Sequence, residues 1–203
     1  MRTRSIEVLL IAISLCCGQA TAQQAAKPEV ATSQQPKTAE QPQGVTEPAA
    51  ELQSLIKALS GKWSISVKFG EGAAPLTGEE TWRSGTGGFT LVEDERLPTP
   101  AGDAFLLGVI WWNGRSKRLE GMECNNQLPF TCDLKGALND ITLSWDGTQF
   151  AISEWETHDG KKTLWHEVWS DITETSFTQT GESEGPDGKR ERMLTIHGTK
   201  VGN

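Results

Sequence analysis

The segment Gly61–Phe69, GKWSISVKF, decides the fold of this 203-residue chain. From Trp63 to Phe69, apolar residues occupy every second position, and Ser or Lys occupies each position between them. A repeat of two residues is typical of a strand that buries one face and exposes the other. The folded part of the chain therefore begins with a half-buried strand.

Turn signals divide the rest of the chain into short strands. Four residue pairs supply the positive φ angles that tight hairpins need: Asn113-Gly114, Asp146-Gly147, Asp159-Gly160 and Asp187-Gly188. Strands are expected near residues 62–69, 77–84, 88–96, 103–112, 115–123, 132–137, 141–145, 148–157, 161–170, 175–183 and 189–200. The sixth and seventh of these segments are either two strands or one bent strand. No helical repeat of useful length follows residue 60.

This order of hairpins predicts the fold class. Consecutive strands without helical crossovers form an antiparallel meander. About ten strands within residues 51–201 can close into an up-and-down barrel, and closure removes exposed sheet edges. We therefore expect an all-β antiparallel barrel. A two-sheet sandwich is the alternative, although it needs longer connections than most of those in this chain.

One short helix is expected before the barrel, over residues 46–60. Apolar residues from Leu52 to Leu59 recur at the spacing of a single helix face. Thr46 is the expected N-cap, and Gly61 is the expected stop. A helix of this length is not stable alone, so we expect it to pack over one end of the barrel. A partner-binding helix is the alternative.

The N-terminal residues are expected to lie outside the barrel domain. Residues 1–22 combine a positive end, a short apolar stretch and a small-residue cleavage site near Ala22, which is typical of a signal peptide. Acylation at Cys16 or Cys17 is the alternative, although neither follows the small residue that such a site normally needs. Residues 23–50, rich in Ala, Gln and Pro, predict a disordered linker. We expect export to the periplasm or the extracellular space.

The charge of the chain argues against two classes of partner. The sequence has 27 acidic and 19 basic residues. Such an acidic surface repels nucleic acid and anionic lipid. The apolar stretch of the signal is also shorter than the about 20 residues that a membrane span needs. We therefore expect no nucleic-acid partner and no membrane span, and the sequence does not indicate an oligomeric state.

The cysteine pair Cys124 and Cys132 predicts a disulfide. Both residues remain after removal of the signal, and paired cysteines in an exported protein most simply form a bond. No His or further Cys lies within a few residues of either one, as a metal site would require. We expect the bond to join two neighbouring strands.

Few residues suggest catalysis or metal binding. The three histidines share no metal-ligand spacing, and the chain has no phosphate loop and no nucleophile elbow. Eight tryptophans and no tyrosine indicate either core packing or an aromatic-lined cavity. The candidate pocket residues are Trp82, Arg83, Glu93, Trp112, Trp165, His166, Glu167 and His197.

The alternation along two strands leaves the inward face open. In one strand, Glu167 shares a face with two tryptophans, and His166 lies on the other face. In another, Glu93 faces inward if the apolar residues before it do. An inward carboxylate needs a partner such as Arg83 or Arg118, or else its pKa is raised. Exposure of Glu93 at a strand end is the alternative.

Several motifs together resemble a known family. They are Leu59-Ser60-Gly61-Lys62-Trp63, Glu80-Thr81-Trp82-Arg83 with Gly87-Gly88-Phe89, Ser144-Trp145-Asp146-Gly147, and Glu167-Val168-Trp169-Ser170-Asp171-Ile172-Thr173 with Ser176-Phe177-Thr178. In their order and spacing, the chain resembles a large bacterial family of secreted domains of unknown function with a calycin (lipocalin-like) barrel. The resemblance covers about residues 52–201 and implies a fold, but it carries no established activity.

The lipocalin analogy also implies how one barrel end closes. In lipocalins, an arginine from the last strand lies across the tryptophan of the Gly-x-Trp motif as a cation–π contact. Here the analogy assigns Trp63 to that tryptophan and Arg190 or Arg192 to that arginine. A functional opening is then expected at the other end of the barrel.

These observations are compatible with four functions. The first is an exported, non-catalytic barrel that holds a small apolar ligand or none. The second is a haem or tetrapyrrole barrel with His197 or His166 as axial ligand. The third is a hydrolase or isomerase with Glu93 or Glu167 as its base and His166 nearby. The fourth is a structural or protein-interaction module of the cell envelope.

Overall fold

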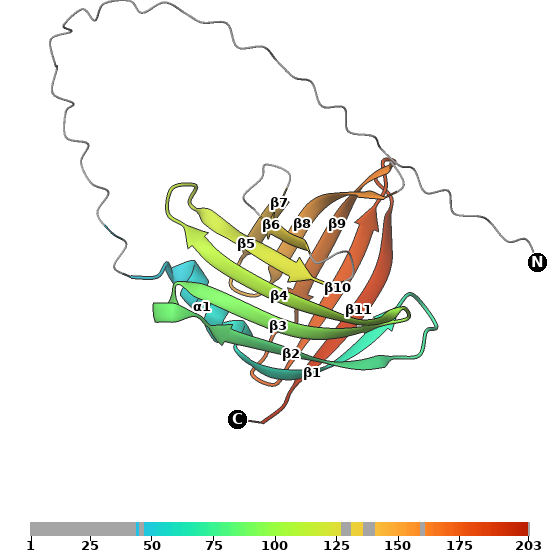
Figure 1. Cartoon of the computed structure of the whole chain (residues 1–203), viewed down its shortest axis with the longest axis horizontal. Coiled ribbons are helices and arrows are strands. Elements are labelled where there is room, and N and C mark those ends of the chain that lie inside the picture. The colour runs from blue at the N-terminus through green and yellow to red at the C-terminus, as the bar shows by residue number, and fades with distance from the viewer. Residues whose placement is uncertain (1–43, 45–46, 127–130, 136–140, 159–160, 203) are drawn as a thin grey trace, which may run out of the picture. The chain divides into compact units, whose positions relative to one another are not determined.

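The chain folds into a β-barrel preceded by one helix (Figure 1). This computed structural model describes residues 44, 47–126, 131–135, 141–158 and 161–202. The predicted signal peptide and nearly all of the predicted linker lie outside these residues. The elements are α1 (Ala50–Leu59), β1 (Gly61–Phe69), β2 (Leu76–Ser84), the 3-10 turn η1 (Thr86–Gly88), β3 (Thr90–Thr99), β4 (Gly102–Asn113), β5 (Arg118–Asn125), β6 (Thr131–Lys135), β7 (Ile141–Trp145), β8 (Phe150–His158), β9 (Lys161–Ser170), β10 (Ser176–Glu184) and β11 (Arg190–Lys200).

The strands form a closed antiparallel up-and-down barrel of ten strands, which confirms the predicted fold class. The order around the sheet is β4-β3-β2-β1-β11-β10-β9-β8-β7-β5, and the pairing of β4 with β5 closes it. Strand β6 is additional and, over the residues that the structure describes, pairs only with β5. The segments near 132–137 and 141–145 are therefore two strands, because β6 pairs with β5 whereas β7 pairs mainly with β8.

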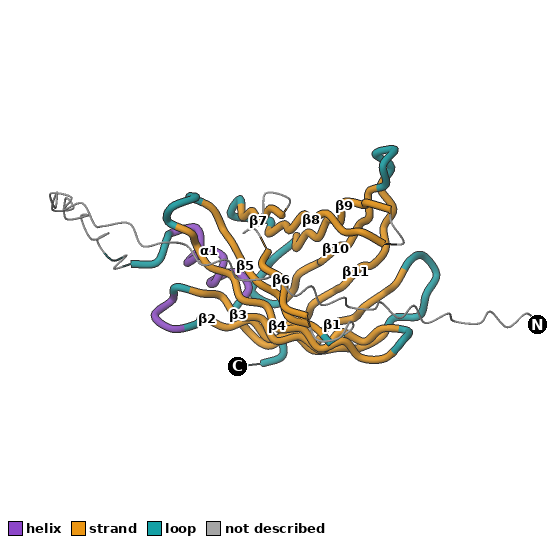
Figure 2. Tube along the Cα trace, turned by 45° about the horizontal axis from the view of Figure 1, so that its top comes forward, coloured by secondary structure: helices purple, strands orange, loops and turns teal. Residues whose placement is uncertain are grey.

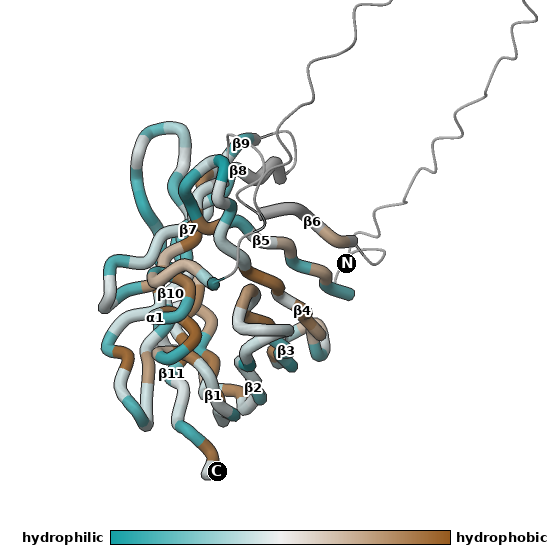
Figure 3. Tube along the Cα trace, turned by 90° about the vertical axis from the view of Figure 1, so that its left-hand side faces the viewer, coloured by the Kyte–Doolittle hydropathy of each residue, from teal (hydrophilic) through white to brown (hydrophobic). Residues whose placement is uncertain are grey.

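The alternation predicted for the first strand holds. In β1, Trp63, Ile65 and Val67 are buried, and the residues between them are partly or fully exposed. The same alternation of buried and more exposed residues recurs in β2 and β10. Hydrophobic and hydrophilic residues both occur along the strands (Figure 3). The barrel therefore has an interior core, to which strands such as β1, β2 and β10 contribute every second side chain.

One predicted hairpin is longer than expected. The Asn113-Gly114 pair predicted a tight turn, but β5 begins only at Arg118. The Asn113 side chain accepts hydrogen bonds from the backbone N–H groups of Arg115 and Ser116, at 2.9 and 3.3 Å. Lys117 takes a positive φ of 55°. This side-chain-to-backbone bonding stabilises a wider turn than a two-residue hairpin.

Helix α1 covers one end of the barrel, beside η1 (Figure 2). Leu52, Leu55 and Leu59 are fully buried in the barrel core. The helix begins at Ala50, so the predicted start near Thr46 is wrong. Pro48 accounts for the later start, since proline disfavours helical backbone in the residue before it. Within the described residues, no helix has the length and apolar character needed to cross a membrane.

Candidate functional site

Aromatic side chains fill the half of the barrel beside α1. Trp63 contacts Phe177 edge to face, with ring centroids 5.0 Å apart. Trp169 contacts both Trp82 and Phe150, at centroid distances of 6.2 and 5.1 Å. None of these five side chains is more than 2% exposed. Trp82, a predicted pocket residue, therefore belongs to a packed core.

A cation covers Trp63, as the lipocalin analogy implied, but the cation is Lys200. Its Nζ atom lies 5.0 Å from the Trp63 ring centroid and donates a hydrogen bond of 2.9 Å to the Ser60 carbonyl. The Trp63 Nε1–H donates to the Leu59 carbonyl at 2.9 Å, so both bonds bind the end of α1. Together these contacts join the helix, the first strand and the last strand.

The prediction that Arg190 or Arg192 closes the barrel is wrong. Trp63 lies opposite Lys200 in the antiparallel β1–β11 pair, whereas both arginines lie at the start of β11. Arg192 is eight residues from Lys200, about 26 Å along an extended strand. Arg190 pairs with Glu184 at 2.7 Å, and Arg192 pairs with Glu182 at 2.8 Å.

The other half of the barrel contains a cavity of about 300 Å³. Its lining includes Phe69 and Thr99, which end β1 and β3 at the side remote from α1. Leu97 and Leu106 also line it and are only partly buried, so solvent reaches the interior here. A volume near 300 Å³ is at the lower end of the range for small-molecule pockets.

The cavity is lined by carboxylates from four strands. The lining glutamates are Glu93 and Glu95 of β3, Glu123 of β5, Glu154 of β8 and Glu167 of β9. No lysine, arginine or histidine is among the described residues that line it. Trp165 and Trp169 of β9 contribute aromatic surface to the same cavity.

Burial changes the protonation of this cluster. Burial raises the pKa of Glu80 to about 7, although a hydrogen bond from Trp82 Nε1–H opposes the shift. Burial, and then the charge of Glu80, raises the pKa of Glu93 well above its usual range. The same two causes raise the pKa of Glu95. These carboxyls therefore hold protons at a pH where exposed glutamates are ionised.

One buried polar atom beside the cavity, Glu95 Oε1, has no hydrogen-bond partner within the described part of the chain. The buried Glu80 carboxyl interacts with Glu93 and with the Trp169 Nε1–H, although Glu80 Oε2 and Trp169 Nε1 lack ideal hydrogen-bond geometry. Glu95 and Trp169 line the cavity directly. An unsatisfied buried polar group costs about 1–3 kcal/mol. A ligand that supplies the missing bond would recover that cost.

Two glycines make room for side chains of the cavity. A Cβ atom on Gly108 would lie 2.6 Å from Glu93 Oε2. A Cβ atom on Gly181 would lie 2.7 Å from the Trp165 ring. Both distances are below van der Waals contact, so a larger residue at either position would displace a cavity side chain.

Three predicted pocket residues do not reach the cavity. Arg83 pairs with Asp94 at 3.3 Å, and both side chains are more than half exposed. His197 is exposed on the outer face of β11, and His166 lies on the face of β9 opposite Glu167. These assignments are wrong because the alternation places them outside the barrel.

The other predicted pocket residues point inward. Glu93, Trp165 and Glu167 line the cavity. Trp112 is partly buried and packs against the core instead. Neither of the two arginines predicted as partners reaches Glu93, because Arg118 pairs with Glu120 and Arg83 points outward. The pKa of Glu93 is raised instead, as predicted for an inward carboxyl without such a partner.

His166 is part of a network on the outer surface. Its Nδ1 atom lies 2.9 Å from Ser153 Oγ, and its Nε2 atom lies 3.2 Å from Glu184 Oε2. Arg190 donates to the same carboxylate at 2.7 Å. The network crosses β8 to β11, whose backbone amides pair between strands. It joins side chains across strands rather than lining the cavity.

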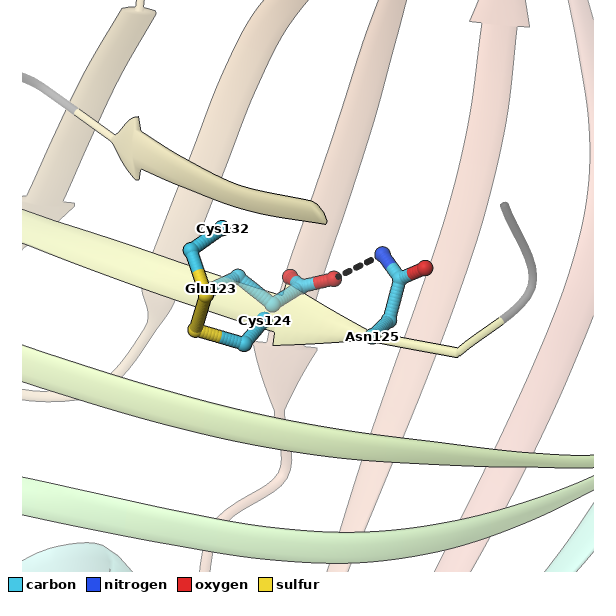
Figure 4. The surroundings of a disulfide bond; sticks show 4 residues. All are labelled: Glu123, Cys124, Asn125 and Cys132. Carbon is cyan, nitrogen blue, oxygen red and sulfur yellow. Dashed lines mark hydrogen bonds between the residues drawn. A yellow bond between two sulfur atoms is a disulfide. The ribbon is translucent and has the colours of Figure 1, made fainter. Parts of the chain in front are cut away.

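The predicted disulfide joins Cys124 of β5 to Cys132 of β6 (Figure 4). The two residues lie directly opposite each other in the antiparallel pair. Glu123 and Asn125, the neighbours of Cys124, line the cavity and are joined by a hydrogen bond of 3.3 Å. The disulfide thus holds β6 to the strand that carries these two cavity residues.

A second, open groove of about 870 Å³ lies outside the barrel, beside α1. Lys57 of the helix and Asp171 and Glu174 of the β9–β10 connection line it. Trp145 donates a hydrogen bond of 3.1 Å to Ser54 Oγ across it. Its lining therefore combines charges of both signs.

The sequence interpretation missed several residues of the site. They are Glu80, Glu95, Glu123, Trp169 and Lys200. Glu95 follows Glu93 by two residues and Glu80 precedes Trp82 by two, so the period of a strand could have placed each on an inward face. Glu123 comes from another strand, and only the register places it near them.

The barrel is consistent with a lipocalin-like fold. Comparison of the sequence with models of known protein families gives no match, and a search of curated proteins also finds no relative. Within the described residues, no group of His, Cys, Asp and Glu has an arrangement suited to a metal ion.

Proposed function

We propose that this protein is an exported, non-catalytic barrel that binds a small ligand in the half remote from α1. One observation carries the proposal. The aromatic core fills one half of the barrel, whereas the other half contains the cavity of about 300 Å³ that solvent reaches. A barrel that served only as a scaffold would gain stability by filling both halves with side chains.

The lining of the cavity favours a ligand with a substantial apolar part. Leucine, isoleucine and phenylalanine side chains account for the apolar lining: Phe69, Leu97, Leu106, Ile152, Leu194 and Ile196. Trp165 adds an aromatic surface. Apolar contact of this kind is the main source of affinity in small-molecule pockets, and the few polar groups orient the ligand.

The haem alternative has less support. A haem inside the barrel needs an axial side chain that reaches the interior. His197 and His166, the two residues named for this role, both lie on the outer face. The enzymatic alternative paired His166 with Glu93 or Glu167, and the barrel wall separates His166 from both.

Native mass spectrometry of protein purified from its own host tests the proposal. We expect a mass excess from a non-covalent small molecule, which is lost on denaturation. The matched variant is Leu106→Trp, which adds bulk to the cavity lining at a partly buried residue outside the core cluster. Loss of the mass excess in the folded variant would support this site. An equal mass excess in the variant would contradict it.

A further inference from the structure

The cavity carries a chemical preference beyond its apolar lining. Its five lining glutamates come from β3, β5, β8 and β9, so strands from much of the barrel direct acidic groups into one space. The described lining offers no basic side chain. A cation that enters this space favours the ionised form of these carboxyls, whereas an anion opposes that ionisation.

Glu95 provides the specific contact. Its Oε1 atom is buried, has no hydrogen-bond partner among the described residues, and belongs to a side chain that lines the cavity. The buried Glu80 lies opposite Glu95 in the β2–β3 pair and adds a second carboxyl at this place. A bound cation favours the ionised form of a neighbouring carboxyl, so Glu95 releases its proton when an ammonium group binds. The ionised oxygen is then an acceptor, and the complementary ligand group is a donor with several N–H bonds.

The rest of the lining suits an organic cation rather than a bare ion. The cavity has the volume of about ten water molecules in the liquid. Trp165 and several aliphatic side chains surround that space. An aromatic face can also attract a cation directly when the site is partly dehydrated.

We propose that the cavity selects small protonated amines with an apolar or aromatic body, the ammonium group bonding to Glu95. This inference rests on the proposed function, because it assigns a ligand class to the same cavity. It differs from that proposal in placing the selectivity in the carboxylates rather than in the apolar lining.

Three probes of similar shape and different charge test the selectivity of the unmodified protein. They are 2-phenylethylamine, 2-phenylethanol and 3-phenylpropanoate, each titrated by calorimetry. We expect the amine to bind at least about tenfold more tightly than the alcohol, since a hydrogen bond to a charged group contributes that much or more. The carboxylate should bind most weakly.

Two substitutions in β3 distinguish a direct bond between the amine and Glu95 from a general effect of the protein's negative charge. Glu95→Gln keeps the side-chain shape and removes the carboxylate. It should cost about tenfold in amine affinity and leave alcohol affinity within about twofold. Asp94→Asn is the matched control, because Asp94 is the adjacent residue, more than half exposed on the outer face. It replaces a carboxyl by an amide in the same way, outside the cavity, and should change neither affinity.

If Glu95→Gln fails to fold, as circular dichroism would show, Glu93→Gln takes its place with the same expectations. The probe series on the unmodified protein needs no variant. Equal binding of amine and alcohol would overturn the amine preference and leave the proposed ligand site intact. Binding of none of the three probes would overturn both. Saturable binding of calcium chloride, lost in Glu95→Gln, would replace the amine by a metal ion.

Discussion

Lys200 shows how a single residue can take over a role that the sequence assigns to another. The Gly-x-Trp motif predicted a cation over Trp63 but not its identity. Glycine at position 61 permits the close approach, because a Cβ there would collide with Lys200 Cε. Gly61 also has a φ of 151°, within the region that side chains rarely adopt. The lysine and the glycine therefore form one closing contact.

Replacement of Lys200 should weaken this closure. Lys200→Met removes the cation–π contact and the hydrogen bond to Ser60. We expect a loss of about 1–2 kcal/mol in the free energy of unfolding, measured by denaturant titration. Arg192→Met is the control, since its ion pair is exposed and should contribute little. An equal loss in the two variants would contradict the assignment of Lys200.

Gly181 should tolerate no side chain. A Cβ there would lie 2.7 Å from the Trp165 ring and 2.9 Å from Leu194. Overpacking of this kind costs about 1–3 kcal/mol of unfolding free energy. Gly181→Ala should therefore lower the urea concentration at the unfolding midpoint by the amount that corresponds to this loss. Gly114→Ala, where no atom lies within 4 Å of the added group, serves as control. Stability equal to that of the control would show that the cavity wall adapts freely.

At the scale of elements, β5 and β6 contribute a local constraint. The disulfide closes a loop with a sequence separation of 8 residues beside the cavity residues Glu123 and Asn125. Register alone places its two cysteines opposite each other. The spacing in the sequence predicted the bond, but it did not predict that β6 lies outside the ten strands of the barrel.

Loss of this disulfide should destabilise the protein moderately. The double variant Cys124→Ala/Cys132→Ala should lose about 2–3 kcal/mol of unfolding free energy, because the unfolded chain regains the entropy of an open loop. Reduction of the unmodified protein with dithiothreitol should reproduce this loss. In a variant with Cys16 and Cys17 replaced by serine, titration of free thiols in the non-reduced protein should find none, and detection of two would contradict the bond.

At the scale of the whole molecule, the glutamate cluster connects stability to pH. The folded state raises the pKa values of Glu80, Glu93 and Glu95, mainly through burial. Between the ordinary pKa near 4.5 and the raised values, the folded state therefore binds more protons than the unfolded state. The stability present below about pH 4.5 from this source is then lost as the pH rises through the folded pKa values.

We therefore expect the barrel to lose stability from pH 5 to pH 8. The shift of Glu80 to about 7 alone corresponds to a loss on the order of 3 kcal/mol over this range. Thermal melts at several pH values measure it. Glu80→Gln should reduce the slope, whereas Glu79→Gln, the exposed neighbour on the opposite face of β2, should not. A flat profile in the unmodified protein would contradict the expectation.

The sequence by itself determined the strands and their closure. Alternation of period two, glycine-containing turn pairs and a leading amphipathic helix depend on local geometry, which each segment specifies for itself. The first strand and the short helix over the barrel follow from such signals. The sequence patterns did not predict the helix start at Ala50, which depends on Pro48. They also did not predict the long turn after Asn113, which depends on hydrogen bonds to the Asn113 side chain.

Only the tertiary structure decided which half of the barrel is filled and what lines the other half. Residues in register on different strands, such as Glu93 opposite Gly108, meet only after the ten strands close. The alternation placed Glu167 and His166 on opposite faces of their strand but did not indicate which face is inward. In the closed barrel, Glu167 faces the cavity and His166 faces outward. Burial then raised the pKa values of the carboxyls. Their number in one cavity is a property of the closed barrel, because it arises from strands far apart in the chain.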